Sequence, residues 1–560
     1  MIEDERTILW VASSLFAFFV LFETYLLNVG YSQYFYNLFR AQGIFLSIPV
    51  SLCICVSFYL FYRFIHVSLT TAWYYKIALF LMFMSACLIE FGYRSSLGRF
   101  TESFDVENAL MTTTDQKLTS IFMYLNYWAA VPCAVFLVAL LIVKSSDDKP
   151  RFKPLAATFA LYVTFFFGFS FFQHFFTEKV FPTVALNAFA KTSADFMLYG
   201  PVANGKWGSS VTGIELKRRE LVKPDPEAIL SPSNNIVLVV DESVRGDHLS
   251  LNGYRRETTP FLQSLARQKI LHNWGIAAAA STGSIFSFNT IITGLTPDDF
   301  PERTNFKINT TPTIFQYAKA MKYQTHFFDG QMKNYWGGIP QDKKWIDKFH
   351  PVNEFDDNGF SPTTEIDNRI AKKVKNIISG SKGNLIVIFK HGSHIPYQNN
   401  FPEERTKWKP SYVTTNKYAI PSESELDQVI NSYDNSILYN VNTFFENLVD
   451  DYAEIPNNTV IIYTGDHGQS LFVGGKTSHG GTTKAEANVP LFVIGKIDEK
   501  VDTAFRASHQ NIFPTVLDLI GYPEKLRSKT IAISLLKARS ADSRPRFFNP
   551  DLDKKVSFDE

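Results

Sequence analysis

Residues 235–243 read NIVLVVDES, an unbroken apolar run that ends in two acidic residues. A short run of this kind, rich in Val, is typical of a strand that is buried on both faces of a sheet. The pattern returns four times further along the chain, at Thr325–Phe328, Leu385–Phe389, Thr459–Tyr463 and Val489–Ile494. Between these runs lie helix-like stretches such as Thr259–Leu271 and Glu423–Asn447. Apolar strands that alternate with helices predict an α/β domain with a largely parallel central sheet.

Acidic and imidazole side chains follow three of these five strands. They are Asp241 and Glu242 after the first strand, His391 and His394 after the third, and Asp466 and His467 after the fourth. Ligands of such sheets bind beyond the carboxyl ends of the strands, so we expect these side chains at one edge. One such residue is usually a helix cap, but three groups together favour a metal site. Carboxylates and imidazoles are the zinc ligands that remain when no thiolate is available.

A segment of small residues offers hydroxyl groups to the same edge. Ala277–Ala280 precede Ser281, Thr282 and Ser284. Small residues let the backbone approach a bound group, and the free N–H groups at the start of a helix suit a phosphate. Metal coordination is one way to turn a hydroxyl into a nucleophile. Helix capping is the commoner role of such residues and stays open for Ser281 and Thr282.

The first part of the chain, residues 1–176, has a different composition that predicts a five-span transmembrane domain. Each of its apolar runs has about 18 residues or more, enough to cross a hydrocarbon core about 30 Å thick. The runs are Ile8–Val29, Ile44–Tyr62, Ala72–Ile89, Ile121–Val143 and Leu155–Phe172. One run alone could be a buried core helix, but five in succession favour a membrane. The first run is too long for a signal peptide and carries Glu23.

Charges in the loops indicate the orientation. With the N-terminus inside, the inner segments carry more Lys and Arg than the outer loops, most densely between Lys144 and Lys153. An odd number of spans then places the soluble part outside the cytoplasm. All four cysteines lie in or at the apolar runs, so none is available to the soluble part for a disulfide. The net charge of +1 and the lack of a basic block argue against a nucleic-acid partner.

Three further divisions follow the transmembrane domain. Residues 177–230 are expected to form a connector with an amphipathic helix, which lies at the membrane surface or packs on the soluble domain. Residues 231–540 are expected to form the catalytic domain, and residues 541–560 a C-terminal tail.

The stretch VVDESVRGDHLSLNGYRRETTPFL, Val239–Leu262, resembles the opening signature of the phosphoethanolamine transferases. These lipid A-modifying and colistin-resistance enzymes belong to the alkaline phosphatase/sulfatase superfamily, and the resemblance covers nearly the whole chain. It implies zinc-dependent transfer of phosphoethanolamine from phosphatidylethanolamine, through a covalent phospho-threonine, to an envelope acceptor such as lipid A or lipopolysaccharide core. It also implies a Gram-negative inner-membrane protein with a periplasmic catalytic domain and a part in polymyxin resistance. We expect a monomer.

The resemblance also implies roles for particular residues. It assigns one zinc ion to Glu242, Thr282, Asp466 and His467, with Thr282 as the nucleophile. Thr282 is preferred over Ser281 because the family places a serine five residues after its nucleophile, where this chain has Ser287.

Further residues match the family at separate motifs. His394, His479 and Lys333 would bind the phosphate, assist proton transfer or hold a second zinc ion. The loop that is thought to hold the ethanolamine group reads Asn108, Thr112 and Gln116, with Gln116 in place of the family's glutamate.

Two other interpretations remain beside phosphoethanolamine transfer. A phosphoglycerol or glycerophosphate transferase would use the same threonine and metal with a different lipid donor. A non-catalytic membrane sensor or scaffold would lack some of the ligands, yet all four are present. A sulfatase is disfavoured because the Cys/Ser-x-Pro-x-Arg motif is absent.

Overall fold

The computed structural model of the 560-residue chain describes the following residues: 2–26, 31–97, 100–101, 106, 125–144, 152–173, 183–199, 220–223, 232–296, 311–331, 339–355, 365–412, 421–449, 458–475, 479–497, 500–527, 532–551 and 554–560. The chain forms two compact units. One comprises Met1–Leu110 with Thr114–Leu216, and the other Met111–Thr113 with Lys217–Glu560.

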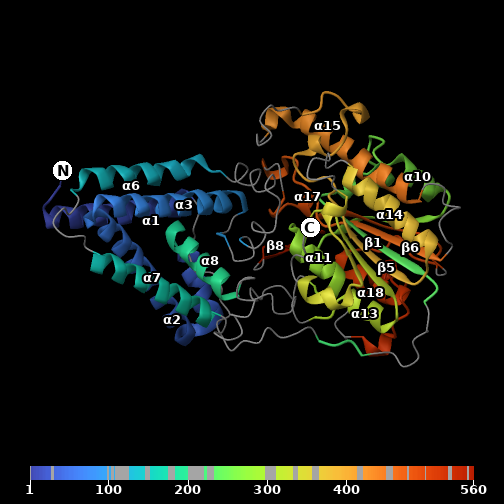
Figure 1. The fold of residues 1–560 in the computed structure, drawn as a ribbon, viewed down its shortest axis with the longest axis horizontal. Coiled ribbons are helices and arrows are strands. Elements are labelled where there is room, and N and C mark those ends of the chain that lie inside the picture. Colours follow the sequence, from blue (N-terminus) through green and yellow to red (C-terminus); the bar gives the residue numbers. More distant parts are fainter. Residues whose placement is uncertain are drawn as a thin grey trace. The chain divides into compact units, whose positions relative to one another are not determined.

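The N-terminal unit consists of helices (Figure 1). They are α1 (Glu5–Leu26), α2 (Tyr31–Thr70), α3 (Trp73–Leu97), α6 (Ala130–Ile142), α7 (Phe152–Gln173) and α8 (Ala185–Tyr199). By length and composition, four segments could cross a membrane: Glu5–Tyr25, Ser47–Thr70, Trp73–Arg94 and Lys153–Ser170. The sequence predicted five spans. Within the described residues, the run expected at Ile121–Val143 forms a shorter apolar helix, Tyr127–Ile142.

Phenylalanine rings form the centre of this unit. Phe19 of α1 lies 5.2 Å from Phe83 of α3 between ring centroids, and Phe83 lies 4.7 Å from Phe136 of α6. All three side chains are fully buried. In a membrane, lipid tails are as apolar as these rings, so close packing rather than water exclusion holds such helices together.

Helix α8, in the region expected to form an amphipathic connector helix, belongs to the N-terminal unit. Its first backbone N–H, at Ala185, donates to Glu23 of α1 at 2.7 Å. Asn187 donates to the Ser57 carbonyl at 2.8 Å and accepts from the Tyr162 hydroxyl at 2.9 Å. These buried bonds hold α8 against α1, α2 and α7.

A seven-stranded sheet forms the centre of the C-terminal unit, with the order β2-β7-β6-β1-β5-β3-β4. The strands are β1 (Asn235–Asp241), β2 (Leu271–Ala278), β3 (Gln324–Asp329), β4 (Lys348–His350), β5 (Asn384–Phe389), β6 (Thr459–Gly465) and β7 (Asn488–Ile494). Strand β1 pairs in parallel with β5 and β6, whereas β7 runs antiparallel to β6 and β2. The predicted α/β fold with a largely parallel sheet is confirmed.

Helices cover both faces of this sheet (Figure 1). One face carries α11 (Ser284–Thr293), α13 (Ile314–Ala320) and α18 (Ile512–Leu519). The other carries α10 (Pro260–Arg267), α14 (Ile366–Gly380), α15 (Leu426–Ile437) and α16 (Phe444–Val449), with a π-turn at Leu438–Thr443 between the last two. All seven residues of β1 are buried because helices lie on both of its sides.

The last residues of the chain pack onto the domain, whereas the sequence suggested a tail at 541–560. Strands β8 (Phe547–Asp551) and β9 (Lys554–Ser557) form an antiparallel hairpin. Phe548 is fully buried and Phe558 is nearly so, and both join the main hydrophobic core. The Asn549 N–H also donates to the Ala280 carbonyl at 2.9 Å. The hairpin therefore supports the small-residue segment that precedes Ser284.

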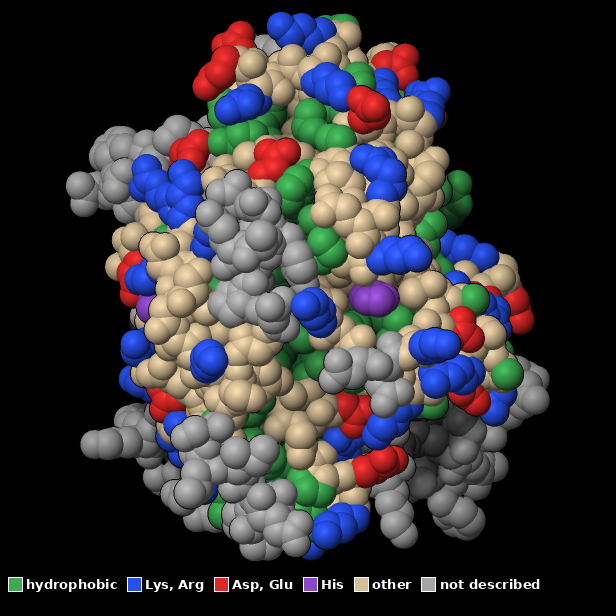
Figure 2. Space-filling view, turned by 90° about the vertical axis from the view of Figure 1, so that its right-hand side faces the viewer, with side chains coloured by type: hydrophobic (Ala, Val, Ile, Leu, Met, Phe, Trp, Pro, Cys, Tyr) green, Lys and Arg blue, Asp and Glu red, His purple; other side chains and the backbone are tan. Residues whose placement is uncertain are grey.

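Charged side chains are mixed on the face seen in Figure 2, where Lys and Arg lie among Asp and Glu without one dominant patch. This distribution agrees with the almost equal numbers of basic and acidic residues in the chain, 55 and 54.

One buried histidine of the sheet should make stability depend on pH. Burial of His326 on β3, together with His350 and Lys348 nearby, lowers its pKa from 6.5 to about 4. The unfolded chain therefore binds a proton that the folded protein does not, and stability falls as pH drops from 6.5 towards 4. At pH 5 we expect a loss of about 2 kcal/mol from this group.

Thermal unfolding of the full chain in detergent at pH 7.5 and pH 5.0 measures this loss. The His326→Phe variant keeps an aromatic ring beside Phe328 and cannot be protonated, so it should lose less stability on acidification. An identical pH response in the two proteins would contradict the assignment.

Candidate active site

Three side chains that could bind a metal meet at the carboxyl ends of two neighbouring strands. Glu242 directly follows β1, and Asp466 and His467 directly follow β6. One ligand atom from each residue lies within 4.8 Å of the others. All three side chains are buried. The parallel pairing of β1 and β6 brings them together, since it places both strand ends at the same edge.

The donor set of Glu242, Asp466 and His467 fits a metal ion. His467 Nδ1 lies 2.9 Å from the Gly468 carbonyl, which fixes the proton on Nδ1 and leaves the lone pair of Nε2 free to bind a metal ion. That Nε2 lies 3.5 Å from Glu242 Oε1 and 3.4 Å from Asp466 Oδ2. Asp466 Oδ2 is buried and has no hydrogen-bond partner among the described residues. A bound cation would satisfy this oxygen.

Electrostatics at the three residues also favour a cation. Burial raises the pKa of Asp466 well above its ordinary value, and the charge of Glu242 raises it further. Burial also opposes ionisation of Glu242, but His467, His394 and His479 hold its pKa below the ordinary value. A positive ion would relieve the repulsion between the two carboxylates.

Among the hydroxyl residues of the segment 281–284, Ser284 is the one that contacts these ligands, and the role expected of Thr282 stays a prediction. Ser284 is the first residue of α11, and its Oγ lies 3.2 Å from His467 Nε2 and 3.4 Å from Glu242 Oε2. Thr282 is buried, and its hydroxyl instead donates to the Gly481 carbonyl at 2.9 Å. Ser284 also lies where the free N–H groups of α11 would face a bound phosphate.

Ser287, whose spacing favoured Thr282 over Ser281 as the nucleophile, forms two hydrogen bonds with the backbone of Ser281. In the structure Ser287 Oγ donates to the Ser281 carbonyl at 2.9 Å and accepts from the Ser281 N–H at 3.2 Å. Ser287 thus closes the turn that precedes α11. That turn directs Thr282 towards the loop containing Gly481 and leaves Ser284 facing Glu242 and His467.

Two further expected histidines lie beside the cluster. The His479 ring lies 4.0 Å from that of His467 between centroids, and the His394 ring lies 5.9 Å from that of His479. Burial lowers the pKa of His479 well below its ordinary value, and His467 lowers it further. Because these rings lie close to His467 and to each other, His479 and His394 are near enough to the cluster to accept or donate a proton during chemistry there.

Polar residues that the sequence did not single out orient Glu242. Gln331 donates to Glu242 Oε2 at 3.0 Å and to the Lys390 carbonyl at 2.9 Å. The Ser243 hydroxyl donates to Glu242 Oε1 at 2.6 Å, and Gln469 donates to that hydroxyl at 2.8 Å. Ser243 has a positive φ of 63°, which produces a sharp turn after β1, and the sequence did not predict this turn.

A buried ion pair fixes the base of the site. Lys390 Nζ lies 2.5 Å from Asp241 Oδ2, which also accepts from the Tyr463 hydroxyl at 2.8 Å. All three side chains are fully buried. Asp241 and Tyr463 belong to β1 and β6, and Lys390 directly follows β5, so the ion pair and the tyrosine hydroxyl couple the three strands whose ends carry the candidate site residues.

Gly392 permits the close approach of the β5 loop to Glu242. It has a φ of 63°, and a Cβ there would lie 2.5 Å from Asp241 Oδ1 and 2.7 Å from the Glu242 nitrogen. Replacement by alanine should therefore displace Glu242 and cost at least about 2 kcal/mol of stability. We expect Gly392→Ala to lower both the unfolding temperature and the amount of bound metal.

A matched control for this variant is Gly380→Ala at the end of α14. A Cβ on Gly380 would meet open space, so this protein should retain its stability and metal content. Equal behaviour of the two variants would contradict the role given to Gly392.

Four expected residues lie outside the described part of the chain. They are Lys333 and the three residues of the expected ethanolamine loop, Asn108, Thr112 and Gln116.

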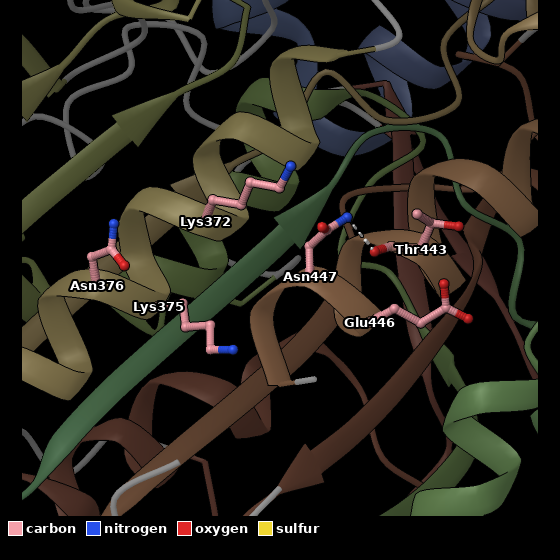
Figure 3. A pocket seen from close by; sticks show the side chains of 6 residues that line it. All are labelled: Lys372, Lys375, Asn376, Thr443, Glu446 and Asn447. Atoms are coloured by element: carbon pink, nitrogen blue, oxygen red, sulfur yellow. Dashed lines mark hydrogen bonds between the residues drawn. The ribbon is translucent and has the colours of Figure 1, made fainter. Parts of the chain in front are cut away.

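A polar groove with a volume of about 490 Å³ lies elsewhere, between α14 and the segment Leu438–Val449. Figure 3 shows Lys372, Lys375 and Asn376 from α14 beside Thr443, Glu446 and Asn447. The Asn447 side chain donates to the Thr443 carbonyl at 2.9 Å. None of the candidate site residues lines this groove.

Comparison with known proteins gives consistent results. The family model described as Sulfatase matches residues 234–522. Kdo(2)-lipid A phosphoethanolamine 7''-transferase from Escherichia coli K12 is 24% identical over 322 residues, which cover 51% of each chain. Phosphatidylethanolamine transferase Mcr-1 from E. coli is 25% identical, with 53% of this chain and 56% of Mcr-1 covered. The matched region thus spans about half the length of these curated relatives.

Two solved structures share the fold. The integral membrane protein lipooligosaccharide phosphoethanolamine transferase A (EptA) from Neisseria meningitidis has a TM-score of 0.59 and 18% identity, with 95% of this chain and 99% of EptA covered. The periplasmic domain of EptC from E. coli in complex with Zn has a TM-score of 0.50 and 20% identity, with 61% of this chain and 97% of that domain covered.

Proposed function

The chain belongs to the family whose model is described as Sulfatase. We propose that, within this family, it transfers phosphoethanolamine from phosphatidylethanolamine to an acceptor in the cell envelope, such as lipid A or lipopolysaccharide core. The observation that carries the proposal is the position of the Ser284 hydroxyl, beside Glu242 and His467 and at the start of α11. The names of the curated relatives, which are phosphoethanolamine transferases, support this choice of group.

Glu242, Asp466 and His467 would hold a zinc ion. When bound, zinc lowers the pKa of a neighbouring hydroxyl and stabilises negative charge on phosphoryl oxygens. The Zn complex of the EptC domain supports this choice of metal. The α11 N-terminus would bind the phosphate through its free N–H groups, and Ser284 would be oriented by its contacts with Glu242 and His467.

The chain's residues suggest a reaction in two displacements. In the first, Ser284 Oγ forms a bond to the phosphorus of the lipid, the bond from phosphorus to the glycerol oxygen breaks, and diacylglycerol leaves with a proton. In the second, an acceptor oxygen attacks the phosphorus and Ser284 is released. His479 or His394 would take the proton from the acceptor, since both rings lie beside the cluster.

The N-terminal helices would hold the enzyme at its lipid substrate. Four of them are long and apolar enough to cross a membrane. With the shorter apolar helix Tyr127–Ile142 as a fifth span, the distribution of Lys and Arg would place the catalytic domain outside the cytoplasm. The relatives from Escherichia coli support the inner membrane and periplasm of a Gram-negative bacterium as the location.

Transfer of phosphoglycerol is the second candidate. Gln116 stands where the family has a glutamate that would attract the ethanolamine ammonium, and a phosphoglycerol donor carries no such ammonium.

The test supplies the purified full chain, in detergent, with zinc, a lipid A acceptor and either phosphatidylethanolamine or phosphatidylglycerol. Mass spectrometry of the glycolipid should show a gain of one phosphoethanolamine unit with the first donor only. A gain of phosphoglycerol would establish the second candidate, and no gain with either donor would contradict both for this acceptor.

A further inference from the structure

The backbone of the four-alanine run is held by residues from the C-terminal part of the chain. The Ala278 N–H donates to the Ala507 carbonyl at 3.2 Å, and the Ala280 carbonyl accepts from the Asn549 N–H at 2.9 Å. The Ala280 N–H donates to a side chain, that of His509, at 3.1 Å. This segment leads directly to Ser284, so whatever holds it also places the hydroxyl.

We propose that His509 is a positioning residue, whose imidazole ties the segment that carries Ser284 to the strand end that carries Asp466 and His467. The proposal rests on the proposed function, because it assigns Ser284 and the metal ligands to one reaction centre. The hydrogen bonds of His509 go to Ala280, Thr464 and Gly465 rather than to the metal-ligand candidates or Ser284, so its role is to fix the distance between them.

The hydrogen bonds of His509 reach both parts of the site. Its Nδ1 accepts from the Ala280 N–H, which requires the ring proton to lie on Nε2. Nε2 then donates to the Gly465 carbonyl at 2.9 Å. Gly465 is the last residue of β6 and immediately precedes Asp466, while Ala280 lies four residues before Ser284.

An imidazole suits this link because it is rigid. Its acceptor and donor nitrogens lie on one planar ring, so the two backbone groups that they bind are held at a fixed separation. His509 is fully buried, and no water competes for either bond. Burial lowers its pKa to about 3, so the ring is neutral at physiological pH and keeps this single donor–acceptor pattern.

The expected consequence of losing the link is displacement rather than unfolding. The segment before Ser284 would keep its bonds to Ala507 and Asn549, and β6 would keep its pairing with β1. A shift of about 1 Å between a nucleophile and its partners can lower a rate by about 100-fold. Loss of a hydrogen bond behind a metal ligand typically lowers metal affinity by 10- to 100-fold, about the range expected here.

Two substitutions separate the two bonds. In His509→Gln the amide nitrogen lies near the position of Nε2, so it can still donate to Gly465 but the acceptor for Ala280 is lost. In His509→Asn the amide oxygen lies near the position of Nδ1, so it can still accept from Ala280 but the donor to Gly465 is lost. His272→Gln and His272→Asn, at a partly exposed histidine of β2, are the matched controls.

The experiment uses the full chain in detergent and measures three quantities for each variant: bound zinc after dialysis against graded chelator, kcat and KM for transfer at saturating zinc, and the unfolding temperature. We expect His509→Gln to keep its zinc affinity within about twofold and to lose about 100-fold in kcat with little change in KM. We expect His509→Asn to lose at least about tenfold in zinc affinity and to recover most of its kcat when zinc is in excess.

Loss of kcat in His509→Gln together with loss of zinc affinity in His509→Asn supports the proposal, since a histidine with only a structural role would not separate the two effects. Losses of kcat and zinc affinity that run in parallel with a lower unfolding temperature in both variants would overturn it. So would wild-type values in both. If the wild-type protein binds zinc but transfers nothing, the proposed function fails, and zinc affinity alone still decides between the two His509 variants.

Discussion

Replacing Ser284 by alanine should lower kcat for phosphoethanolamine transfer by at least about 1,000-fold. The reason is that Ser284 Oγ lies 3.2 Å from His467 and 3.4 Å from Glu242, and in the proposed reaction this oxygen forms the covalent bond to phosphorus. The measurement is the rate of acceptor modification by the full chain. Zinc content should stay close to that of the wild-type protein, because Glu242, Asp466 and His467 remain.

Thr282→Val is the control that distinguishes the two hydroxyls. It removes only the bond from Thr282 to the Gly481 carbonyl, which is worth about 1 kcal/mol, so we expect a loss in kcat of no more than about tenfold. Ser284→Thr keeps a hydroxyl at the same position and should retain part of the activity. An inactive Thr282→Val protein together with an active Ser284→Ala protein would show that Thr282, as the resemblance implies, is the nucleophile.

Replacing His467 by alanine should remove the metal and, with it, the activity. His467 Nε2 is the nitrogen donor of the three-residue cluster, and the two carboxylates that remain would repel each other in a buried site. We expect zinc affinity to fall by more than about 100-fold and transfer to fall with it at limiting zinc. Equilibrium dialysis with elemental analysis measures the first quantity.

A control for the zinc measurement is His272→Ala, which alters a histidine on β2 remote in sequence from the cluster. It should bind zinc as the wild-type protein does. Wild-type zinc affinity in His467→Ala would show that the ion binds elsewhere, for instance at His394 and His479.

The sequence predicted the centre of the sheet better than its edges. The five apolar runs became β1, β3, β5, β6 and β7, because strands that are buried on both faces must be apolar throughout. Strand β4, with three residues at the edge, is too short to produce a pattern. Strand β2 buries Leu271, Trp274 and Ala277, which are three residues apart, and contains Gly275 at a positive φ, so it lacks the alternation that indicates a strand.

The only candidate site residues whose proximity could be predicted from the sequence are those that directly follow a strand. Glu242, Asp466 and His467 follow strands whose order brings them together, and a parallel sheet makes that proximity predictable. The choice between Thr282 and Ser284 depends on the turn that Ser287 closes, and two residues along a loop can reverse the direction of a side chain. His509 and the C-terminal hairpin contact Ala280 from positions more than 200 residues further along the chain, and no local sequence motif predicts these contacts.

The most direct test of the account is to locate the covalent intermediate. The full chain with bound zinc is incubated with phosphatidylethanolamine and no acceptor, then digested and mapped by peptide mass spectrometry. We expect a phosphoethanolamine group on Ser284 in the wild-type protein and no such group in the Ser284→Ala variant. The same group on Thr282 or Ser281, or no protein adduct while diacylglycerol is released, would contradict it.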